Sequence, residues 1–191
     1  MNKYIKGVVN KNNLQNFCFE IQKDSLFVIN SNNGSGKTTL LKCICDILDY
    51  DGSITVADKK IKTEDVSFYF SGDEFLEPNM SVRKNCKYFL KKEEMDLDVF
   101  KKFNIDDKMD CLVSEMSAGN KQKLKLAITI SKRKHYYVLD EPTNYLDEQA
   151  ICEFVNILLD KKTQGTIIVA TNDHYFCELV SDYTCDLMGE I

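Results

Sequence analysis

The stretch Leu26–Leu41, with the sequence LFVINSNNGSGKTTLL, decides the fold of this chain. Its first four residues form an apolar run of the kind that builds a buried strand. A glycine-rich turn follows, and from Leu40 to Leu48 apolar residues recur at helical spacing. The sequence therefore predicts a strand, a tight turn and a helix in immediate succession.

The turn resembles the phosphate-binding P-loop, G-x-x-x-x-G-K-[ST]. Gly34 and Gly36 let the backbone approach phosphate oxygens, and the loop amides and helix N-terminus supply donors. In this motif Lys37 reaches the terminal phosphates and the Thr38 hydroxyl ligates Mg²⁺. Ser31 replaces the first glycine of the pattern, at a cost of about 1 kcal/mol if the backbone there is left-handed. The alternative is a plain glycine-rich turn. The predicted nucleotide-binding residues are Ser31, Asn32, Asn33, Gly34, Ser35, Gly36, Lys37, Thr38 and Thr39.

Composition limits the class of protein. The chain has 191 residues, 43% hydrophobic and 29% charged, which is typical of a soluble globular protein. Its net charge of -5 argues against a nucleic-acid partner. The 8 cysteines lie among apolar residues without a C-x-x-C motif, which favours small buried side chains in a reducing cytosol. No apolar run approaches the roughly 18 residues of a membrane span, so a membrane function requires a partner that supplies the membrane part.

The N-terminal part is expected to be antiparallel. Residues 3–9 and 17–21 have the alternation of paired strands, and Asp51-Gly52 is predicted to be a tight turn before a strand at 53–56. Another strand is predicted at 66–70. These short strands precede residues 81–114, where charged residues are frequent and apolar side chains recur at helical spacing.

The remaining chain alternates between strands and helices. Residues 81–114 are rich in charge, with apolar side chains at helical spacing, and we interpret residues 78–116 as an inserted helical subdomain. Beyond it we expect a helix at 118–131, buried strands at 136–139 and 166–170, and helices at 147–160 and 175–180. The predicted fold is one α/β domain, residues 1–191, with a mostly parallel sheet, an antiparallel N-terminal β subdomain and this helical insertion.

A second polar cluster follows a predicted buried strand. Asp140 and Glu141 stand at its carboxyl end, where ligands bind in open α/β sheets. An aspartate in that position, together with the P-loop threonine Thr38, is the pairing that holds Mg²⁺ beside a nucleotide. Glu141 is suited to act as general base toward water. The alternative is that both acids only cap the turn Pro142–Asn144.

Taken together, four segments make the sequence resemble an ABC-type ATPase, the nucleotide-binding subunit of ABC transporters. In chain order they are the P-loop, a signature-like segment Met116–Lys123, a Walker B-like segment Tyr136–Glu141, and a D-loop-like segment Pro142–Asp147. The run Asp140–Asp147, DEPTNYLD, is the most specific of these pieces. The resemblance covers nearly the whole chain and implies the P-loop NTPase fold with ATP and Mg²⁺ as ligands.

The resemblance also implies roles for further residues. Ser117, Ala118 and Gly119 correspond to the signature, which in the family closes over ATP on the P-loop of a second subunit. The family's Q-loop glutamine has no clear match, since Ser71, Gly72 or Asp73 occupies that place, and Asp73 is taken as a third metal residue. The family's switch histidine falls at Asn172, which is expected to act beside Glu141 and Lys37 in catalysis. The aromatic residue that stacks on adenine in the family has no clear match here.

The leading function implied is an ATP-hydrolysing subunit that drives transport through a separate membrane permease. It would act as a homodimer or heterodimer of ATPase subunits, in the cytoplasm against the inner face of the membrane. The compact length and the D-loop favour export. Two alternatives remain: a nucleotide-binding regulator with little hydrolysis, because of Ser31 and Asn172, and a soluble ABC ATPase without a transport role.

Overall fold

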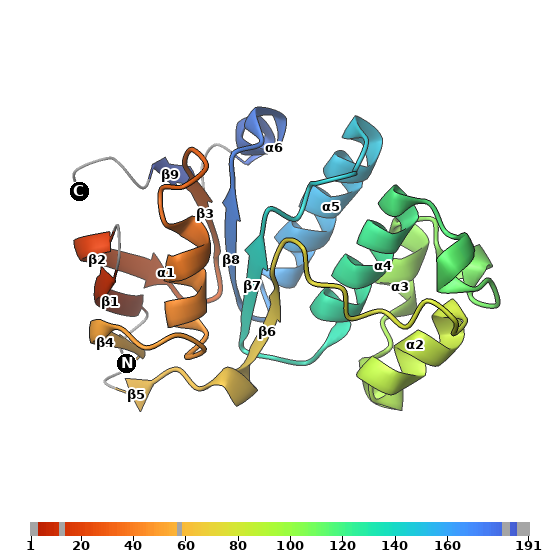
Figure 1. The fold of residues 1–191 in the computed structure, drawn as a ribbon, viewed down its shortest axis with the longest axis horizontal. Coiled ribbons are helices and arrows are strands. Elements are labelled where there is room, and N and C mark those ends of the chain that lie inside the picture. The colour runs from red at the N-terminus through yellow and green to blue at the C-terminus, as the bar shows by residue number, and fades with distance from the viewer. Residues whose placement is uncertain (1–3, 12–13, 57–58, 181–183, 187–191) are drawn as a thin grey trace.

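The computed structural model describes residues 4–11, 14–56, 59–180 and 184–186, and it contains two sheets (Figure 1). The first sheet is antiparallel, with the strand order β2-β1-β4-β5. Its strands are β1 (Tyr4–Lys11), β2 (Leu14–Gln22), β4 (Asp51–Val56) and β5 (Lys59–Lys60). The predicted antiparallel N-terminal part is confirmed.

The second sheet is parallel, with the order β6-β7-β8-β3-β9. Its strands are β6 (Val66–Tyr69), β7 (Tyr136–Asp140), β8 (Thr166–Thr171), β3 (Leu26–Asn30) and β9 (Thr184–Asp186). Every residue of β7 and β8 is buried, as expected for strands covered on both faces. The carboxyl ends of β3 and β7, which lead into the P-loop and end in Asp140, open at the same edge of the sheet.

Helices cover the two faces of the parallel sheet. Helix α1 (Lys37–Ile44) lies between the two sheets in Figure 1, where Leu40 and Leu41 join side chains of both. The opposite face packs against α4 (Ala118–Ser131), α5 (Glu148–Lys161) and α6 (His174–Leu179). Strand β7 shows the division, because Tyr136 and Val138 face α1 while Tyr137 and Leu139 face α4 and α5. This core fixes α1 relative to β7.

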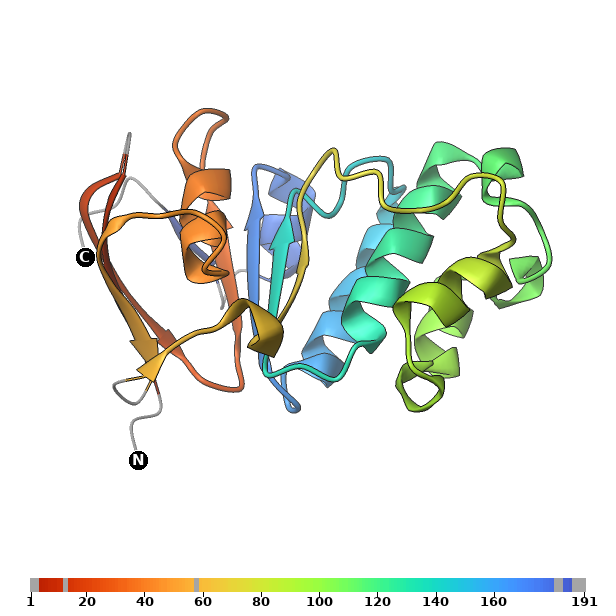
Figure 2. The ribbon, with the colours of Figure 1, turned by 60° about the horizontal axis from the view of Figure 1, so that its bottom comes forward.

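The inserted helices lie at the far end of the molecule from the antiparallel sheet (Figures 1 and 2). They are α2 (Val82–Phe89) and α3 (Leu97–Lys102), with three short 3₁₀ turns at Lys92–Glu94, Asp106–Lys108 and Val113–Glu115; a fourth, Thr63–Asp65, precedes β6. Helix α4 contacts α2 and α3 and also packs on β6. The division at 78–116 therefore remains an interpretation, since α4 belongs to both packing units.

Two local predictions were wrong. Helix α1 ends at Ile44 and not near Leu48, because Asp46 takes a left-handed backbone with φ 56°. The predicted turn at Asp51-Gly52 is the start of β4, paired with β1. Glycine is required there because a side chain at Gly52 would lie 2.0 Å from the carbonyl oxygen of Val8. In the described part of the chain, no helix is long and apolar enough to cross a bilayer.

Candidate functional site

The P-loop residues lie between β3 and α1, as the sequence predicts. Gly34 and Gly36 have φ values of 82° and 103°, in the left-handed region that favours glycine. Gly36 is the residue before the helix, and its carbonyl accepts the first helical hydrogen bond from Leu40 at 2.9 Å. Ser31 has no positive φ, so the replacement of the family's first glycine carries no left-handed strain.

Lys37 is held inside this loop with its charge paired. Its side chain is 6% exposed, and Nζ donates to the carbonyl oxygens of Ser31 and Asn32, the latter at 3.2 Å. The same Nζ lies 3.2 Å from Oε1 of Glu141. A buried ammonium needs such partners. The loop therefore holds a cation at the point where terminal phosphates would lie.

Asp140 and Thr38 join β7 to α1. The Thr38 hydroxyl donates to Oδ2 of Asp140 at 2.7 Å. Asp140 is 2% exposed, and burial raises its pKa, while the Thr38 hydrogen bond opposes this and the neighbouring Glu141 charge adds to it. Its Oδ1 is buried and has no hydrogen-bond partner in the described structure. One carboxylate oxygen therefore remains available to a ligand.

This donor set fits Mg²⁺. Among the described residues, no three or more histidine, cysteine, aspartate or glutamate side chains gather as a metal site. Magnesium does not need such a cage, because it is held by one or two protein oxygens together with substrate phosphates and water. The free Oδ1 of Asp140 and the Thr38 hydroxyl supply oxygens of that kind.

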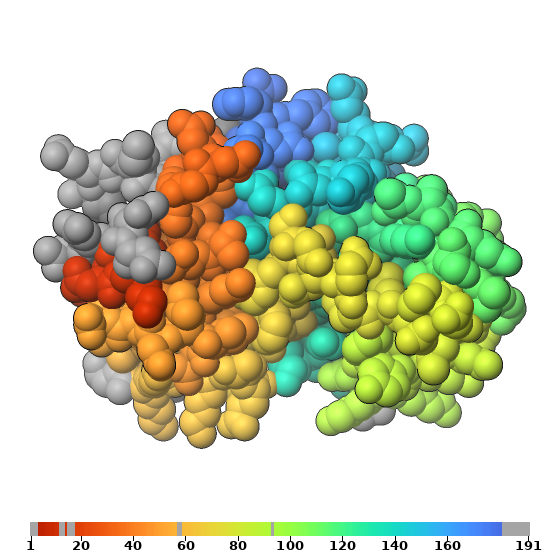
Figure 3. Space-filling model, viewed as in Figure 1, coloured from red at the N-terminus to blue at the C-terminus, as the bar shows by residue number. Residues whose placement is uncertain are grey.

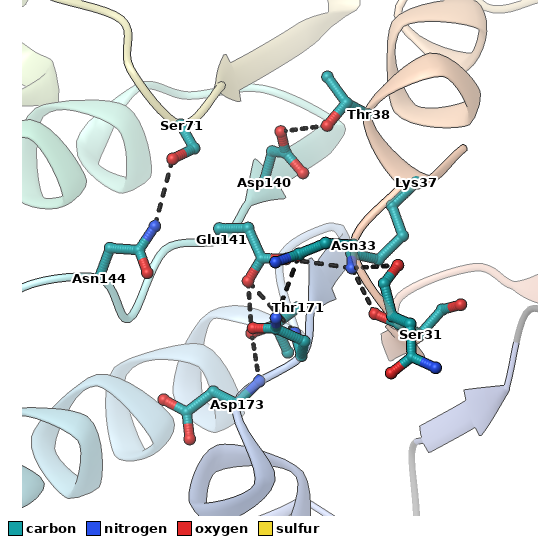
Figure 4. Close-up of polar contacts among 12 residues, drawn as sticks. Ser31, Asn33, Lys37, Thr38, Ser71, Asp140, Glu141, Asn144, Thr171 and Asp173 are labelled. Atoms are coloured by element: carbon teal, nitrogen blue, oxygen red, sulfur yellow. Dashed lines mark hydrogen bonds and ion pairs between the residues drawn. The ribbon is translucent and has the colours of Figure 1, made fainter. Parts of the chain in front are cut away.

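Glu141 points back toward the P-loop and is held from a third strand (Figure 4). Its Oε2 accepts hydrogen bonds from the Thr171 hydroxyl at 3.0 Å and from the backbone N–H of Asn172 at 3.2 Å. The Asn172 side chain in turn donates to Oδ1 of Asn33 at 3.1 Å. The end of β8 thus binds both the candidate base and the P-loop. Thr171 was missed from sequence, because nothing local marks it.

A cavity of about 360 Å³ lies above these groups, and Figure 3 shows the orange P-loop segment and the yellow segment after β6 on either side of this hollow. Its lining residues are Asn33, Gly34, Ser35, Gly36, Lys37, Thr38, Thr39, Ser71, Asp140 and Glu141. The structure thus brings together most of the predicted phosphate, metal and base residues. The described lining includes no aromatic side chain.

Asp73 is the predicted metal residue that the structure does not bring to this cavity. It lies two residues beyond Ser71 and lines a separate pocket beside Phe68 and Phe89. Ser71 lines the phosphate cavity instead, and its hydroxyl accepts a hydrogen bond from the Asn144 side chain at 3.2 Å. Ser71, and not Asp73, therefore lines the same cavity as Thr38 and Asp140.

The signature-like residues lie apart from the cavity. Ser117 caps α4, and its hydroxyl accepts from the N–H of Asn120 at 3.2 Å. A side chain at Gly119 would lie 2.9 Å from the Tyr145 carbonyl oxygen, so the start of α4 packs on the D-loop-like turn. Neither Ser117, Ala118 nor Gly119 lines the cavity of its own chain.

Replacing Asp140 by asparagine is expected to raise the thermal stability of the ligand-free protein while weakening the candidate Mg²⁺ site. The folded pKa of Asp140 lies above its unfolded value, so the folded state binds more protons and stability falls as pH rises between the two values. Asparagine removes this cost, and we expect the Tm of the ligand-free protein at neutral pH to rise, by about 2–4 °C for each 1 kcal/mol of stability gained in a chain of this size. The gain should vanish below the unfolded pKa of aspartate. Thermal unfolding between pH 3 and 8 measures it, and an unchanged or lower Tm at pH 7 would contradict the account.

Comparisons with known proteins identify a family and a fold for this chain. The family model described as ABC transporter matches residues 14–144. The ABC transporter ATP-binding protein YybJ of Bacillus subtilis strain 168, named as uncharacterized, is 31% identical over 172 residues, which cover 84% of this chain and 78% of that protein. The L-cystine import ATP-binding protein TcyC of the same organism is 26% identical over 203 residues, with 93% and 81% covered. A solved Pyrococcus furiosus protein, named as a candidate ABC transporter ATP-binding protein, shares the fold with a TM-score of 0.79 at 23% identity, covering 96% of this chain and 97% of that one.

Proposed function

This chain belongs to the family of ABC transporter ATP-binding proteins, P-loop ATPases that hydrolyse ATP, and we propose that it does so in the cavity between Lys37 and Glu141. The observation that carries this proposal is the convergence of two distant segments. Thr38 contacts Asp140 at 2.7 Å and Lys37 contacts Glu141 at 3.2 Å, although each pair is about a hundred residues apart in sequence.

Each residue has a proposed role. The P-loop amides and Lys37 hold the β- and γ-phosphates and stabilise the charge that develops on them. Thr38 and Asp140 would hold Mg²⁺, which would supply positive charge beside the phosphates. Glu141 accepts a proton from the attacking water. The Asn172 side-chain amide, which contacts Asn33 in the ligand-free structure, donates a hydrogen bond to the terminal phosphate when ATP is bound.

The ligand-free contacts must be exchanged when ATP binds. Lys37 is paired with Glu141, and a γ-phosphate would compete for the same ammonium. Release of Lys37 from Glu141 would leave the carboxylate with the Thr171 hydroxyl and the Asn172 N–H, which keep it oriented. ATP binding would thus give Lys37 a phosphate partner in place of Glu141 and free the Glu141 carboxylate to accept a proton from water.

The experiment that tests hydrolysis is phosphate release by the purified chain with ATP, in Mg²⁺ and in EDTA. We expect turnover that requires Mg²⁺ and is lost when Glu141 is replaced. Binding of ATP without any hydrolysis, with or without a permease, would favour the nucleotide-binding regulator instead.

We propose that two such chains, or this chain and a related one, pack head to tail so that the signature of each closes on the ATP of the other. Ser117 caps α4 and does not line the phosphate cavity of its own chain, and this position supports the arrangement. Its hydroxyl and the N-terminus of α4, a helix of 14 residues, offer donors to a phosphate.

Mixing two inactive variants tests this arrangement. Ser117→Asp keeps a good N-cap but places a negative charge at the signature, so we expect it to be inactive yet folded. Lys37→Ala inactivates the P-loop. A dimer of one chain of each kind retains one intact P-loop facing one intact signature, so the mixture should regain up to about a quarter of the wild-type rate. No recovery in phosphate release, with mixed dimers shown by co-purification of two differently tagged chains, would contradict head-to-tail packing.

The membrane partner and the location are also proposals. The chain should sit on the cytoplasmic face of the membrane against a separate permease, and co-purification from membranes with a permease subunit tests both. Export is the direction predicted from the sequence. The similarity to a cystine importer means that direction has to be measured with the permease in sealed vesicles, with ATP supplied on one side at a time.

A further inference from the structure

Gln122, in the second turn of α4, is buried between three elements of the chain. It is 3% exposed, and its Nε2 donates to the Pro142 carbonyl oxygen at 2.7 Å. Its Oε1 accepts from the Tyr69 hydroxyl, at the end of β6, at 3.0 Å. The Pro142 carbonyl can only accept, which fixes the amide orientation and makes Tyr69 the donor on the other side.

Pro142 follows Glu141, whose backbone needs support. Glu141 has φ 45°, in the left-handed region that residues with a side chain rarely adopt. On one side of this residue, the Glu141 N–H donates to the Ala170 carbonyl oxygen at 2.7 Å. On the other side, the hydrogen bond from Gln122 holds the Pro142 carbonyl. The Gln122 amide thus holds the chain immediately after the candidate base.

The same helix supports the rest of this turn. A side chain at Gly119 would lie 2.9 Å from the Tyr145 carbonyl oxygen, so α4 approaches the turn closely one helical turn before Gln122. Asn144 of the turn contacts Ser71, just beyond Tyr69. Helix α4, the end of β6 and the turn after β7 therefore meet at Gln122.

We propose that Gln122 is a positioning residue for ATP hydrolysis, which holds the turn after Glu141 on α4 so that the carboxylate faces the phosphate cavity. The inference rests on the proposed function. Gln122 does not line the cavity, and its side chain bonds to Tyr69 and Pro142 in the described structure, so it is linked to the reaction through the turn that follows Glu141. Because α4 begins at the signature, the amide also ties that segment to the base of the same chain.

The test replaces Gln122 by methionine, which is of similar size but cannot donate to Pro142. We expect kcat to fall about 10- to 100-fold while the KM for ATP stays within about 2-fold, because the phosphates are held elsewhere. Tyr69→Phe removes only the donor that orients the amide, and kcat should fall by about 2- to 5-fold. The ATP affinity of both variants should match that of the wild type in a binding titration.

Ser67→Ala is the matched control. The Ser67 hydroxyl is buried and donates to the Thr129 carbonyl oxygen at 2.7 Å, so it joins β6 to α4 as Tyr69 and Gln122 do, without touching the turn. We expect Ser67→Ala to lower the Tm and leave kcat unchanged. If Gln122→Met also lowers only the Tm, Gln122 is a structural residue and the inference is overturned.

The outcomes separate this inference from the proposed function. If the wild type hydrolyses ATP and Gln122→Met has the same kcat, the inference about Gln122 is overturned while the proposed function stands. If the wild type does not hydrolyse ATP, the proposed function fails, and the backbone amide NMR shifts of Glu141 and of residues 143–146 decide the inference. These shifts should change in Gln122→Met and not in Ser67→Ala; equal spectra for the turn in all three proteins would overturn it.

Discussion

Replacing Glu141 by glutamine is expected to lower kcat for ATP hydrolysis by about 10²- to 10⁴-fold, the usual loss when a general base is removed. The glutamine oxygen can still accept from Thr171 and Asn172, so the side chain should stay in place. Binding of ATP should be retained or tightened, because Lys37 loses its carboxylate partner and is free for phosphate. Phosphate release and a nucleotide titration measure the two quantities.

Glu148→Gln is the control for this variant. Glu148 is an exposed carboxylate in the first turn of α5, a few residues beyond Glu141, and does not line the cavity. Its replacement should leave kcat and ATP affinity as in the wild type. Hydrolysis by Glu141→Gln at the wild-type rate would show that another group activates water.

Replacing Lys37 by alanine is expected to weaken ATP binding by at least about 10- to 100-fold, and turnover with it. Hydrogen bonds from a charged group contribute about 1.5–3 kcal/mol each, and Lys37 is the side-chain cation that lines the cavity in the described structure. The loop carbonyls of Ser31 and Asn32 also lose their donor, so the loop itself should loosen. A titration with ATP in the presence of Mg²⁺ gives the affinity.

Lys42→Ala separates this effect from a general loss of positive charge. Lys42 lies on the same helix, further along, where its Nζ sits 5.3 Å from the Phe70 ring, and it does not line the cavity. We expect its removal to change ATP affinity little. Equal affinities for wild type and Lys37→Ala would mean that the phosphates bind elsewhere.

The sequence was sufficient where a local pattern has one physical cause. The glycines of the P-loop permit left-handed angles, and the structure shows those angles at Gly34 and Gly36. The apolar runs that became β7 and β8 are buried on both faces, which only a covered parallel sheet requires. Because β3 and β7 end at the same edge of this sheet, the meeting of Asp140 with the P-loop followed from the topology.

The sequence was insufficient where a contact depends on residues far apart in the chain. The hydrogen bonds from Asn172 to Asn33 and from Thr171 to Glu141 carry no local pattern. Gln122 lies in the signature-like segment, but that pattern does not indicate that its amide bonds to Pro142. Helical periodicity also continued past the end of α1, because the left-handed Asp46 that ends the helix is not marked by a glycine or proline. The sequence also does not show which side chain after β6 faces the cavity. Asp73 was therefore predicted as a metal residue because it is a carboxylate, whereas Ser71 lines the cavity.

A nucleoside triphosphate with its metal should lie between Lys37 and the pair Asp140-Glu141. The most direct measurement is a crystal structure of the Glu141→Gln variant with ATP and Mg²⁺. We expect the γ-phosphate within hydrogen-bond distance of Lys37 Nζ. The metal should be bound by the Thr38 hydroxyl and by the Asp140 carboxylate, directly or through water. A nucleotide bound elsewhere, with Lys37 still on the carbonyls of Ser31 and Asn32, would contradict this placement.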